Sequence, residues 1–227
     1  MIRIQNVSKT YRSGDLAVHA LKDISLTIES GAFLAVAGPS GSGKTTLLNC
    51  VGCIDQADSG LISIGEDMVS EMDNTGRTQF RRRNLGFIFQ SYNLIPVLTT
   101  YENIALALQL NSNNTKEIDR KTREILREVG LQGLEDRRPS RLSGGQQQRV
   151  AVARALVGNP KLILADEPTA NLDSHTGEAI LDLMKEMNRR HGITFIFSTH
   201  DKMVMERADR LIRLHDGEIQ SDTGGKQ

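Results

Sequence analysis

The chain has 227 residues, and its 28 lysines and arginines balance its 28 aspartates and glutamates. This length suffices for one generous α/β domain, or two small ones, with a substantial buried core. The formal net charge of zero disfavours a sequence-independent grip on nucleic acid, which needs many phosphate neutralisations.

The apolar runs of the sequence are short. The longest, such as residues 33–37 and 193–197, fall far below the roughly 18 to 20 residues that span a bilayer. The start, MIRIQNVSKT, lacks the basic segment and apolar block of a secretory signal. We therefore expect a cytoplasmic protein that contacts the membrane only through a partner.

Two kinds of strand pattern occur along the chain. Residues 2–4, 24–28 and 61–65 alternate apolar with polar side chains, which is the period of half-buried strands. We expect these segments to form an antiparallel layer, with Ile62 and Ile64 facing opposite to their neighbours. Four other runs are short and almost wholly apolar, as in parallel strands covered on both faces: residues 33–37, 85–89, 162–165 and 193–197.

Residues 38–45, GPSGSGKT, fit the phosphate-loop pattern G-x-x-x-x-G-K-[ST]. The loop follows an apolar strand and opens a helical run, so backbone amides converge on a phosphate chain. Lys44 adds positive charge toward the β and γ phosphates, and the Thr45 hydroxyl is placed to ligate magnesium. The predicted phosphate-site residues are Gly38, Pro39, Ser40, Gly41, Ser42, Gly43, Lys44, Thr45 and Thr46.

The two cysteines, Cys50 and Cys53, have a spacing that also occurs in redox and metal sites. Two ligands cannot close a zinc site, however. We place both residues in the second and third turns of the helix after the phosphate loop, past the amides that lower a thiol pKa. We therefore expect them to serve packing.

Between Gln90 and Ser143 the sequence changes to helices and polar linkers. Residues 111–115, NSNNT, are expected to form a loop. In the segment 118–129 that follows, apolar residues share one helical face, charged residues fill the other, and Gly130 ends the helix.

A second glycine-containing turn, Ser143-Gly144-Gly145-Gln146, begins another helix. Serine followed by glutamine three places later is a capping box. Capping does not require the two glycines, whose missing side chains let an anion approach the helix N-terminus. Because the first loop already surrounds a nucleotide and the second lies beyond a helical segment, the simplest arrangement uses two chains.

Two carboxylates follow the apolar strand 162–165. Asp166 is placed to hold magnesium through water, and Glu167 to orient or deprotonate an attacking water. Alone this pair is commonplace, but together with the phosphate loop it predicts a site for nucleoside triphosphate hydrolysis.

The order of these motifs, with LSGGQ, LILADE, Gln90 and His200, resembles that of the ATP-binding cassette (ABC) ATPases over nearly the whole chain. The resemblance implies an α/β P-loop NTPase (RecA-like) fold with a parallel core, an antiparallel β layer and an inserted helical subdomain. It implies one domain over residues 1–227, with its core in 1–90 and 144–227 and the helical subdomain in 91–143. It also implies a head-to-tail homodimer around two ATP and Mg²⁺, in which Ser143 and Gly145 contact the partner's γ-phosphate.

The resemblance assigns further roles. Tyr11 resembles the aromatic residue that stacks on adenine, although a lone tyrosine after a strand is equally suited to surface packing. Gln90 resembles the glutamine that meets magnesium and the attacking water; otherwise it is a polar strand end. His200 resembles the histidine at the γ-phosphate, and Asp173 the aspartate that couples the two sites across the dimer.

Two functions fit this resemblance: the ATPase subunit of a transport or mechanotransmission system with separate permeases, and a soluble ABC ATPase acting on DNA or ribosomes. The chain has neither the second cassette nor the coiled coil typical of the latter. Segments 86–104 and 170–180 resemble the branch of lipoprotein-release, macrolide-export and cell-division ATPases. Cys50 and Cys53 replace residues usually apolar or small there, and Thr45 stands where serine is common.

Two arginine clusters, residues 81–83 and Arg137, Arg138 and Arg141, are compatible with nucleic-acid or lipid-headgroup contacts. With a neutral chain we expect solvated or structural arginines instead. One cluster is also suited to an acidic helix of a permease. We expect no nucleic-acid partner.

Overall fold

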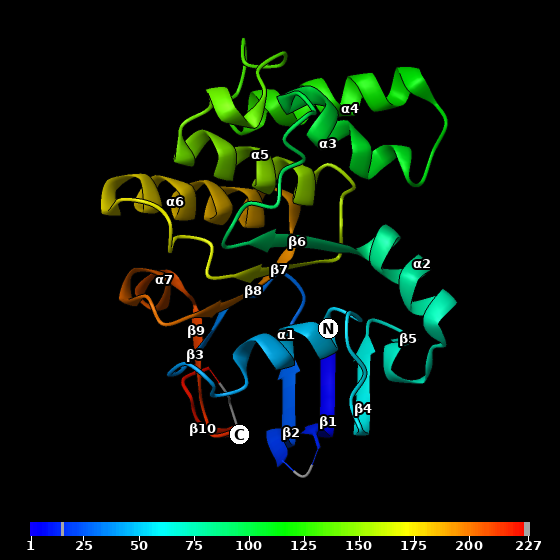
Figure 1. Cartoon of the computed structure of the whole chain (residues 1–227), viewed down its shortest axis with the longest axis vertical. Helices are drawn as coiled ribbons and strands as arrows, with labels where there is room; N and C mark the ends of the chain where they lie inside the picture. Colours follow the sequence, from blue (N-terminus) through cyan, green and yellow to red (C-terminus); the bar gives the residue numbers. More distant parts are fainter. Residues whose placement is uncertain (15, 225–227) are drawn as a thin grey trace.

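The structure, a computed structural model, describes residues 1–14 and 16–224 and contains two β-sheets (Figure 1). The larger sheet has the strand order β10-β9-β3-β8-β7-β6. All its neighbours are parallel except β9 and β10, which are antiparallel. Its strands are β3 (Phe33–Ala37), β6 (Leu85–Phe89), β7 (Leu162–Asp166), β8 (Thr194–Thr199), β9 (Arg210–His215) and β10 (Glu218–Asp222).

The four apolar runs form four neighbouring parallel strands of this sheet, in the order β3-β8-β7-β6, and parallel pairing was predicted. The strand predicted at residues 193–197 is displaced slightly, since β8 runs from Thr194 to Thr199. The sequence analysis assigned no strand to β9 or β10. In β9 the buried Ile212 and Leu214 alternate with exposed polar residues, and β10 is exposed or half-buried, so both lack the continuous apolar signal of the central strands.

The smaller sheet is antiparallel, with the order β2-β1-β4-β5. The predicted alternation is confirmed: Ile62 and Ile64 are buried, whereas Leu61 is 40% exposed. Its strands are β1 (Ile2–Ser13), β2 (Leu16–Ile28), β4 (Ser59–Ile64) and β5 (Asp67–Met68).

Helices cover both faces of the larger sheet. Alternate residues of β7 show the division: Leu164 packs in one core with α1, and Ile163 packs in another with α5 and α6. Consequently α1 and α5 lie on opposite faces of the sheet (Figure 1). The helices are α1 (Lys44–Val51), α2 (Asn74–Asn84), α3 (Thr100–Gln109), α4 (Thr115–Glu128), α5 (Gly144–Leu156), α6 (Ser174–His191) and α7 (Lys202–Arg207), with 3₁₀ turns η1 (Val69–Glu71) and η2 (Pro139–Arg141).

The segment between β6 and α5 is helical, as predicted. Its helices α3 and α4 pack on each other and on α5. Thr122 and Ile125 lie on the buried face of α4, and Gly130 follows with a left-handed φ of 71°. The division of the chain at residues 91 and 143 stays a prediction, and the domain range 1–227 includes residues outside the described ones.

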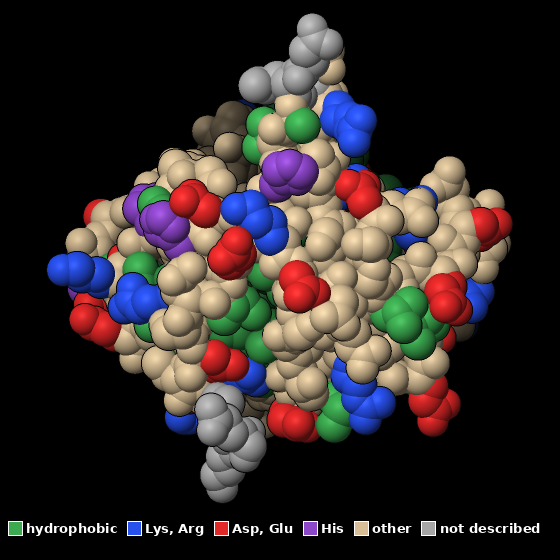
Figure 2. Space-filling view, turned by 90° about the horizontal axis from the view of Figure 1, so that it is seen from below, with side chains coloured by type: hydrophobic (Ala, Val, Ile, Leu, Met, Phe, Trp, Pro, Cys, Tyr) green, Lys and Arg blue, Asp and Glu red, His purple; other side chains and the backbone are tan. Residues whose placement is uncertain are grey.

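The surface carries both signs of charge. Figure 2 shows acidic and basic side chains interspersed on the face that contains the antiparallel sheet. Among the helices of residues 1–14 and 16–224, none combines the length and the apolar character that crossing a bilayer requires.

Candidate functional site

The phosphate loop lies between β3 and α1, and two of its glycines are required by close backbone neighbours. A side chain at Gly38 would overlap the carbonyl of Leu214, and one at Gly43, whose φ is 99°, would overlap the carbonyl of Ala20. The turn after β9 also holds the loop, because the Gly217 amide donates to the Ser42 carbonyl at 3.1 Å. Contacts from β2, from β9 and from the turn between β9 and β10 therefore hold the phosphate loop in place. The sequence analysis did not predict β9 or β10.

Lys44 holds the loop from inside. Its ammonium donates to the carbonyls of Gly38 at 2.8 Å and Pro39 at 2.9 Å, and the residue is only 8% exposed. An ammonium group has three N–H donors, so one remains for an anion at the loop. Lys44 can thus bind a phosphate oxygen with its third N–H while keeping both carbonyl contacts.

Thr45 and Asp166 bring two oxygen groups together from the ends of α1 and β7. The Thr45 hydroxyl lies 3.3 Å from both Asp166 carboxylate oxygens. Oxygen ligands of this kind suit Mg²⁺, which typically keeps several waters and takes the rest of its ligands from phosphates. Within the described part of the chain, no group of three or more His, Cys, Asp or Glu residues is placed to hold a metal. The pair therefore fits a magnesium ion that arrives with a triphosphate.

Glu167 and His200, predicted independently, are in direct contact. Glu167 Oε1 lies 2.6 Å from His200 Nδ1, and Oε2 accepts from the Thr199 hydroxyl at 3.3 Å. A carboxylate only accepts, so Nδ1 carries the shared proton and leaves Nε2 free for another partner. Contacts from Thr199 at the end of β8 and from His200 just after it thus orient the carboxylate of Glu167. The backbone of Glu167 is left-handed, with a φ of 46°.

Gln90 follows β6 directly. In the sheet register Phe89 pairs with Asp166, so Gln90 and Glu167 both follow the paired carboxyl ends of β6 and β7. The Gln90 carbonyl accepts from Asn171 Nδ2 at 2.9 Å, which joins the Gln90 loop to the loop before α6. That second loop ends at Asp173, which caps α6 by accepting from the Thr176 amide at 2.9 Å. Hydrogen bonds from Thr176 lower the pKa of Asp173.

The capping box at Ser143 is present as predicted. Ser143 Oγ accepts from the Gln146 amide at 3.3 Å, and Gln146 Oε1 accepts from the Ser143 amide at 3.0 Å. The two glycines have a reason that the sequence analysis did not give. A Cβ at Gly145 would lie 2.5 Å from Thr176 Cγ2, and one at Gly144 would lie 3.1 Å from the Tyr92 hydroxyl. Both glycines therefore make room for residues of their own chain.

This packing predicts the effect of adding one methyl group. We expect Gly145→Ala to destabilise the fold by about 1 to 3 kcal/mol, because the new Cβ overlaps the methyl of Thr176. Thr176→Ser removes that methyl and keeps the hydroxyl, so the double variant should recover most of the loss. Urea unfolding of the three variants measures the effect. A double variant no more stable than Gly145→Ala alone would contradict it.

Tyr11 lies inside β1, so the expectation that it follows a strand is wrong. Its hydroxyl donates to Asp55 Oδ2 at 2.7 Å, and the Lys9 ammonium lies 5.3 Å from the ring centroid. Burial, together with the bond to Asp55, raises the pKa of Tyr11. The hydroxyl is therefore satisfied within the chain, and the ring, in a residue that is 41% exposed, remains available for stacking. The sequence analysis missed Lys9 and Asp55; the i, i+2 spacing of Lys9 and Tyr11 on one strand was the available signal.

The cysteines serve packing, as expected, although one is placed differently. Cys50 is in α1, but α1 ends at Val51, so Cys53 follows the helix rather than forming part of it. Both are buried free thiols. Burial raises the pKa of Cys50 to about 12 and that of Cys53 to about 11, which disfavours thiolate chemistry at neutral pH.

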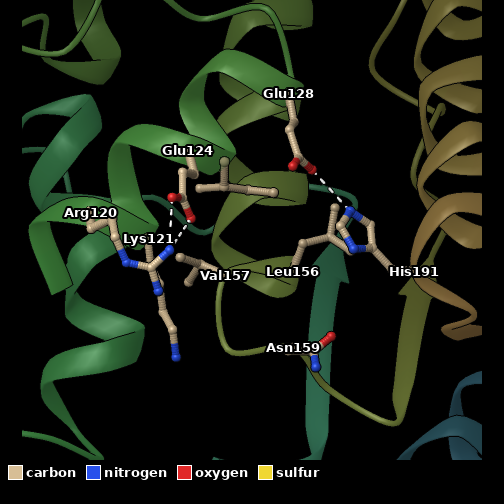
Figure 3. Close-up of a pocket in the computed structure, with 9 residues that line it drawn as sticks. Arg120, Lys121, Glu124, Glu128, Leu156, Val157, Asn159 and His191 are labelled. Atoms are coloured by element: carbon tan, nitrogen blue, oxygen red, sulfur yellow. Dashed lines mark hydrogen bonds and ion pairs between the residues drawn. The ribbon is translucent and has the colours of Figure 1, made fainter. Parts of the chain in front are cut away.

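A separate pocket of about 260 Å³ lies where α4 and α6 end (Figure 3). Figure 3 shows Glu128 of α4 in contact with His191 of α6, and their side chains are 2.9 Å apart. None of the predicted site residues lines this pocket. Its cations are matched by acids, since Arg120 pairs with Glu124 at 2.8 Å.

Comparison with known proteins gives consistent matches. The family described as "ABC transporter" matches residues 21–170. The ABC transporter ATP-binding protein MJ0796 of Methanocaldococcus jannaschii is 43% identical over 98% of this chain and 96% of its own length. A macrolide export ATP-binding/permease protein, MacB of Mannheimia succiniciproducens, is 44% identical over 98% of this chain but only 34% of its own length. The chain thus spans about a third of the MacB relative.

A solved structure resembles the fold closely. It is the dimeric structure of a post-hydrolysis state of the MJ0796 cassette bound to ADP and Pi. Its TM-score is 0.89 at 42% identity, and the match covers 98% of this chain and 97% of that one.

Proposed function

The chain belongs to the ABC transporter family and is an ATP-binding, ATP-hydrolysing cassette, and we propose that two copies dimerise head to tail around two ATP and Mg²⁺ to drive a separately encoded membrane permease. We also propose that residues 1–227 form one cassette domain, with residues 91–143 as its helical subdomain.

One observation carries the dimer proposal: α1 and α5 pack on opposite faces of the larger sheet. The phosphate loop opens α1, whereas Ser143 opens α5. Ser143 therefore does not complete the phosphate site of its own chain, and a second copy supplies the missing side. The dimeric MJ0796 structure with ADP and Pi supports this arrangement in a relative.

In the proposed dimer, each residue set has its own task. Lys44 and the loop amides bind the phosphates, Tyr11 stacks on adenine, and Thr45, Asp166 and Gln90 hold the magnesium. Magnesium, when bound, neutralises charge on the β and γ phosphates. The partner's residues 143–146 contact the γ-phosphate from the other side, with Asp173 at the boundary between the two sites.

Hydrolysis then depends on how Glu167 is held. Thr199 and His200 orient its carboxylate, which positions and deprotonates a water for in-line attack on the γ-phosphate. The free Nε2 of His200 is available to donate to the phosphate when protonated. Cleavage removes the anion that both chains share, so the dimer separates.

A groove between the core and the helical segment is the proposed permease site. It has a volume of about 280 Å³ and is lined by Arg82 and Arg154 together with apolar residues such as Phe87 and Leu110. Leu110 is 53% exposed. A short amphipathic segment with an acidic residue fits this lining.

Arg154 also links the groove to the loop after Gln90 in the candidate ATP site. Burial lowers the pKa of Arg154, and its guanidinium donates to the carbonyls of Tyr92 at 2.8 Å and Asn93 at 2.5 Å. Those residues follow Gln90 closely, so an occupant of the groove would bear directly on the Gln90 loop.

We propose a peripheral location on the cytoplasmic face of the cell membrane, held by the permease. The relatives described above carry transporter names, and none is named for work on DNA or ribosomes. The alternative of a soluble cassette acting on DNA or ribosomes therefore has no support here.

The permease proposal is tested by fractionating native cells that express tagged chain. We expect Leu110→Glu to reduce membrane association at least tenfold while ATPase activity of the free chain changes little, because a charge in the apolar groove opposes docking. Leu61→Glu, also an exposed leucine (40%) but on the antiparallel sheet, is the matched control. Crosslinking should recover a multi-span membrane protein. Equal membrane fractions for both variants, or crosslinks to ribosomes instead, would contradict the proposal.

A further inference from the structure

Gln148 is the one polar residue among the buried residues of α5. Its side chain is fully buried, and its amide nitrogen donates to the Pro168 carbonyl at 2.6 Å. The side-chain oxygen accepts no hydrogen bond from the described residues. Methionine would fill similar space without burying an amide, so packing alone does not account for a glutamine here.

The segment that Gln148 contacts carries Glu167. A φ of 46° is unfavourable for a residue with a side chain, and the residue before a proline is restricted further. Such a conformation persists only where the surroundings fix it. The Glu167 amide donates to Ser198 on β8 at 2.9 Å, and Gln148 holds the next carbonyl from α5.

A series of hydrogen bonds links residues 167–169 to the end of β8 and the residues that follow it. The Thr169 hydroxyl donates to Asp201 at 2.8 Å, the Asp201 amide donates to Thr199 Oγ1 at 2.9 Å, and that hydroxyl donates to Glu167 at 3.3 Å. The orientation of Glu167 therefore depends on where residues 167–169 lie between β8 and α5. Gln148 provides the side-chain contact from α5 to this segment.

Gln148 also lies close to the start of α5. It is five residues beyond Ser143, about 7.5 Å along a rigid helix. Any shift of the helix that accompanies contact between Ser143 and a phosphate moves the donor of the Pro168 bond.

We propose that Gln148 is a positioning residue that couples the two ATP sites within one chain: contact of Ser143 with the partner's triphosphate is transmitted through α5 and the Pro168 carbonyl to Glu167. The inference rests on the proposed function, because it takes Ser143 to contact the partner's nucleotide.

The test uses Gln148→Met, which keeps the length of the side chain but removes the amide that donates to the Pro168 carbonyl. We expect kcat to fall about tenfold to a hundredfold, since a displaced catalytic group loses that much. ATP affinity should stay within about twofold, because the phosphate loop lies on the other face of the sheet. Gln147→Met is the matched control, since the Gln147 side-chain amide donates to the nearby Leu142 carbonyl at 3.1 Å.

A second variant separates positioning from packing. Gln148→Glu keeps the shape but donates to Pro168 only when protonated, which burial favours. The ratio of its kcat to that of the unaltered protein should rise between pH 8 and pH 6, whereas the ratio for Gln148→Met should stay flat. In a Glu167→Gln background, Gln148→Met should neither lower the residual turnover further nor prevent the ATP-dependent dimer.

Normal kcat in Gln148→Met, an equal loss in Gln147→Met, or parallel pH ratios for the two Gln148 variants would overturn the inference. Loss of the dimer in the double variant would also overturn it, since Gln148 would then shape the Ser143 surface. If Glu167→Gln alone formed no dimer, the proposed function itself would fail. Because that variant keeps Gln148, its failure is distinct from a failure of the Gln148 inference.

Discussion

Replacing Glu167 with glutamine is expected to lower kcat for ATP hydrolysis by about a hundredfold to ten-thousandfold. Glutamine has nearly the same shape: its amide oxygen can accept from His200, and its NH2 group can donate to the Thr199 hydroxyl, so the local structure should survive. Its amide cannot take the proton of the attacking water, so the chemical step fails. ATP should still bind, because Lys44 and the loop are unchanged.

The same variant should collect as a dimer when ATP and Mg²⁺ are present. Light scattering measures the mass, and phosphate release measures turnover. Glu186→Gln, an exposed glutamate of α6, is the control and should hydrolyse normally and show no stable dimer. Turnover at the normal rate in Glu167→Gln would remove Glu167 from the role of general base.

Ser143→Arg should abolish the ATP-dependent dimer while a single chain still binds ATP with nearly normal affinity. The arginine occupies the surface that we propose meets the partner's γ-phosphate. Ser143 begins α5, which packs on the opposite sheet face from α1, the helix that the chain's own phosphate loop opens. Analytical ultracentrifugation in the Glu167→Gln background measures the dimer, and equilibrium dialysis measures ATP binding.

Loss of the helix cap needs a separate control, since removing an N-cap costs about 1 kcal/mol. Ser143→Asp retains a good cap and adds a negative charge, which repels the γ-phosphate, so it should also prevent the dimer. Asn113→Arg adds the same cation as Ser143→Arg to the loop between α3 and α4 and should dimerise normally. Parallel loss of ATP binding and dimerisation in Ser143→Arg would instead place Ser143 in its own chain's site.

The parallel centre of the fold is readable from the sequence for a physical reason. Strands covered on both faces need apolar residues at successive positions, so β3, β7 and β8 leave a continuous signal. In contrast, β10 forms one edge of the sheet and β9 lies beside it, and polar and apolar residues mix in both strands. Their place beside the phosphate loop arises from contacts between distant parts of the chain, such as Leu214 with Gly38, which no local pattern encodes.

The candidate site likewise has features that the sequence predicts and features that it does not. Local motifs predict the loop that carries Lys44 and the cap at Ser143, because a few adjacent residues specify each. The contact between Glu167 and His200 depends on β7 and β8 being neighbours, and the fit of Gly145 against Thr176 depends on how α5 packs on α6. Such contacts follow from tertiary packing, so the sequence analysis could name Glu167, His200 and Gly145 without predicting their partners.

Mixing two defective chains tests the shared site most directly. Lys44→Ala prevents ATP binding by the phosphate loop of its own chain. Ser143→Arg blocks the surface that contacts ATP bound by the partner. Each variant alone should therefore remain monomeric with ATP and Mg²⁺ in the Glu167→Gln background. In the mixture, Lys44 of one chain and Ser143 of the other form one intact site, while the arginine faces a loop that holds no triphosphate. We predict a mixed dimer containing one ATP, measured by native mass spectrometry. A mixture that stays monomeric while the Ser143→Arg chain binds ATP would contradict a site built from two chains.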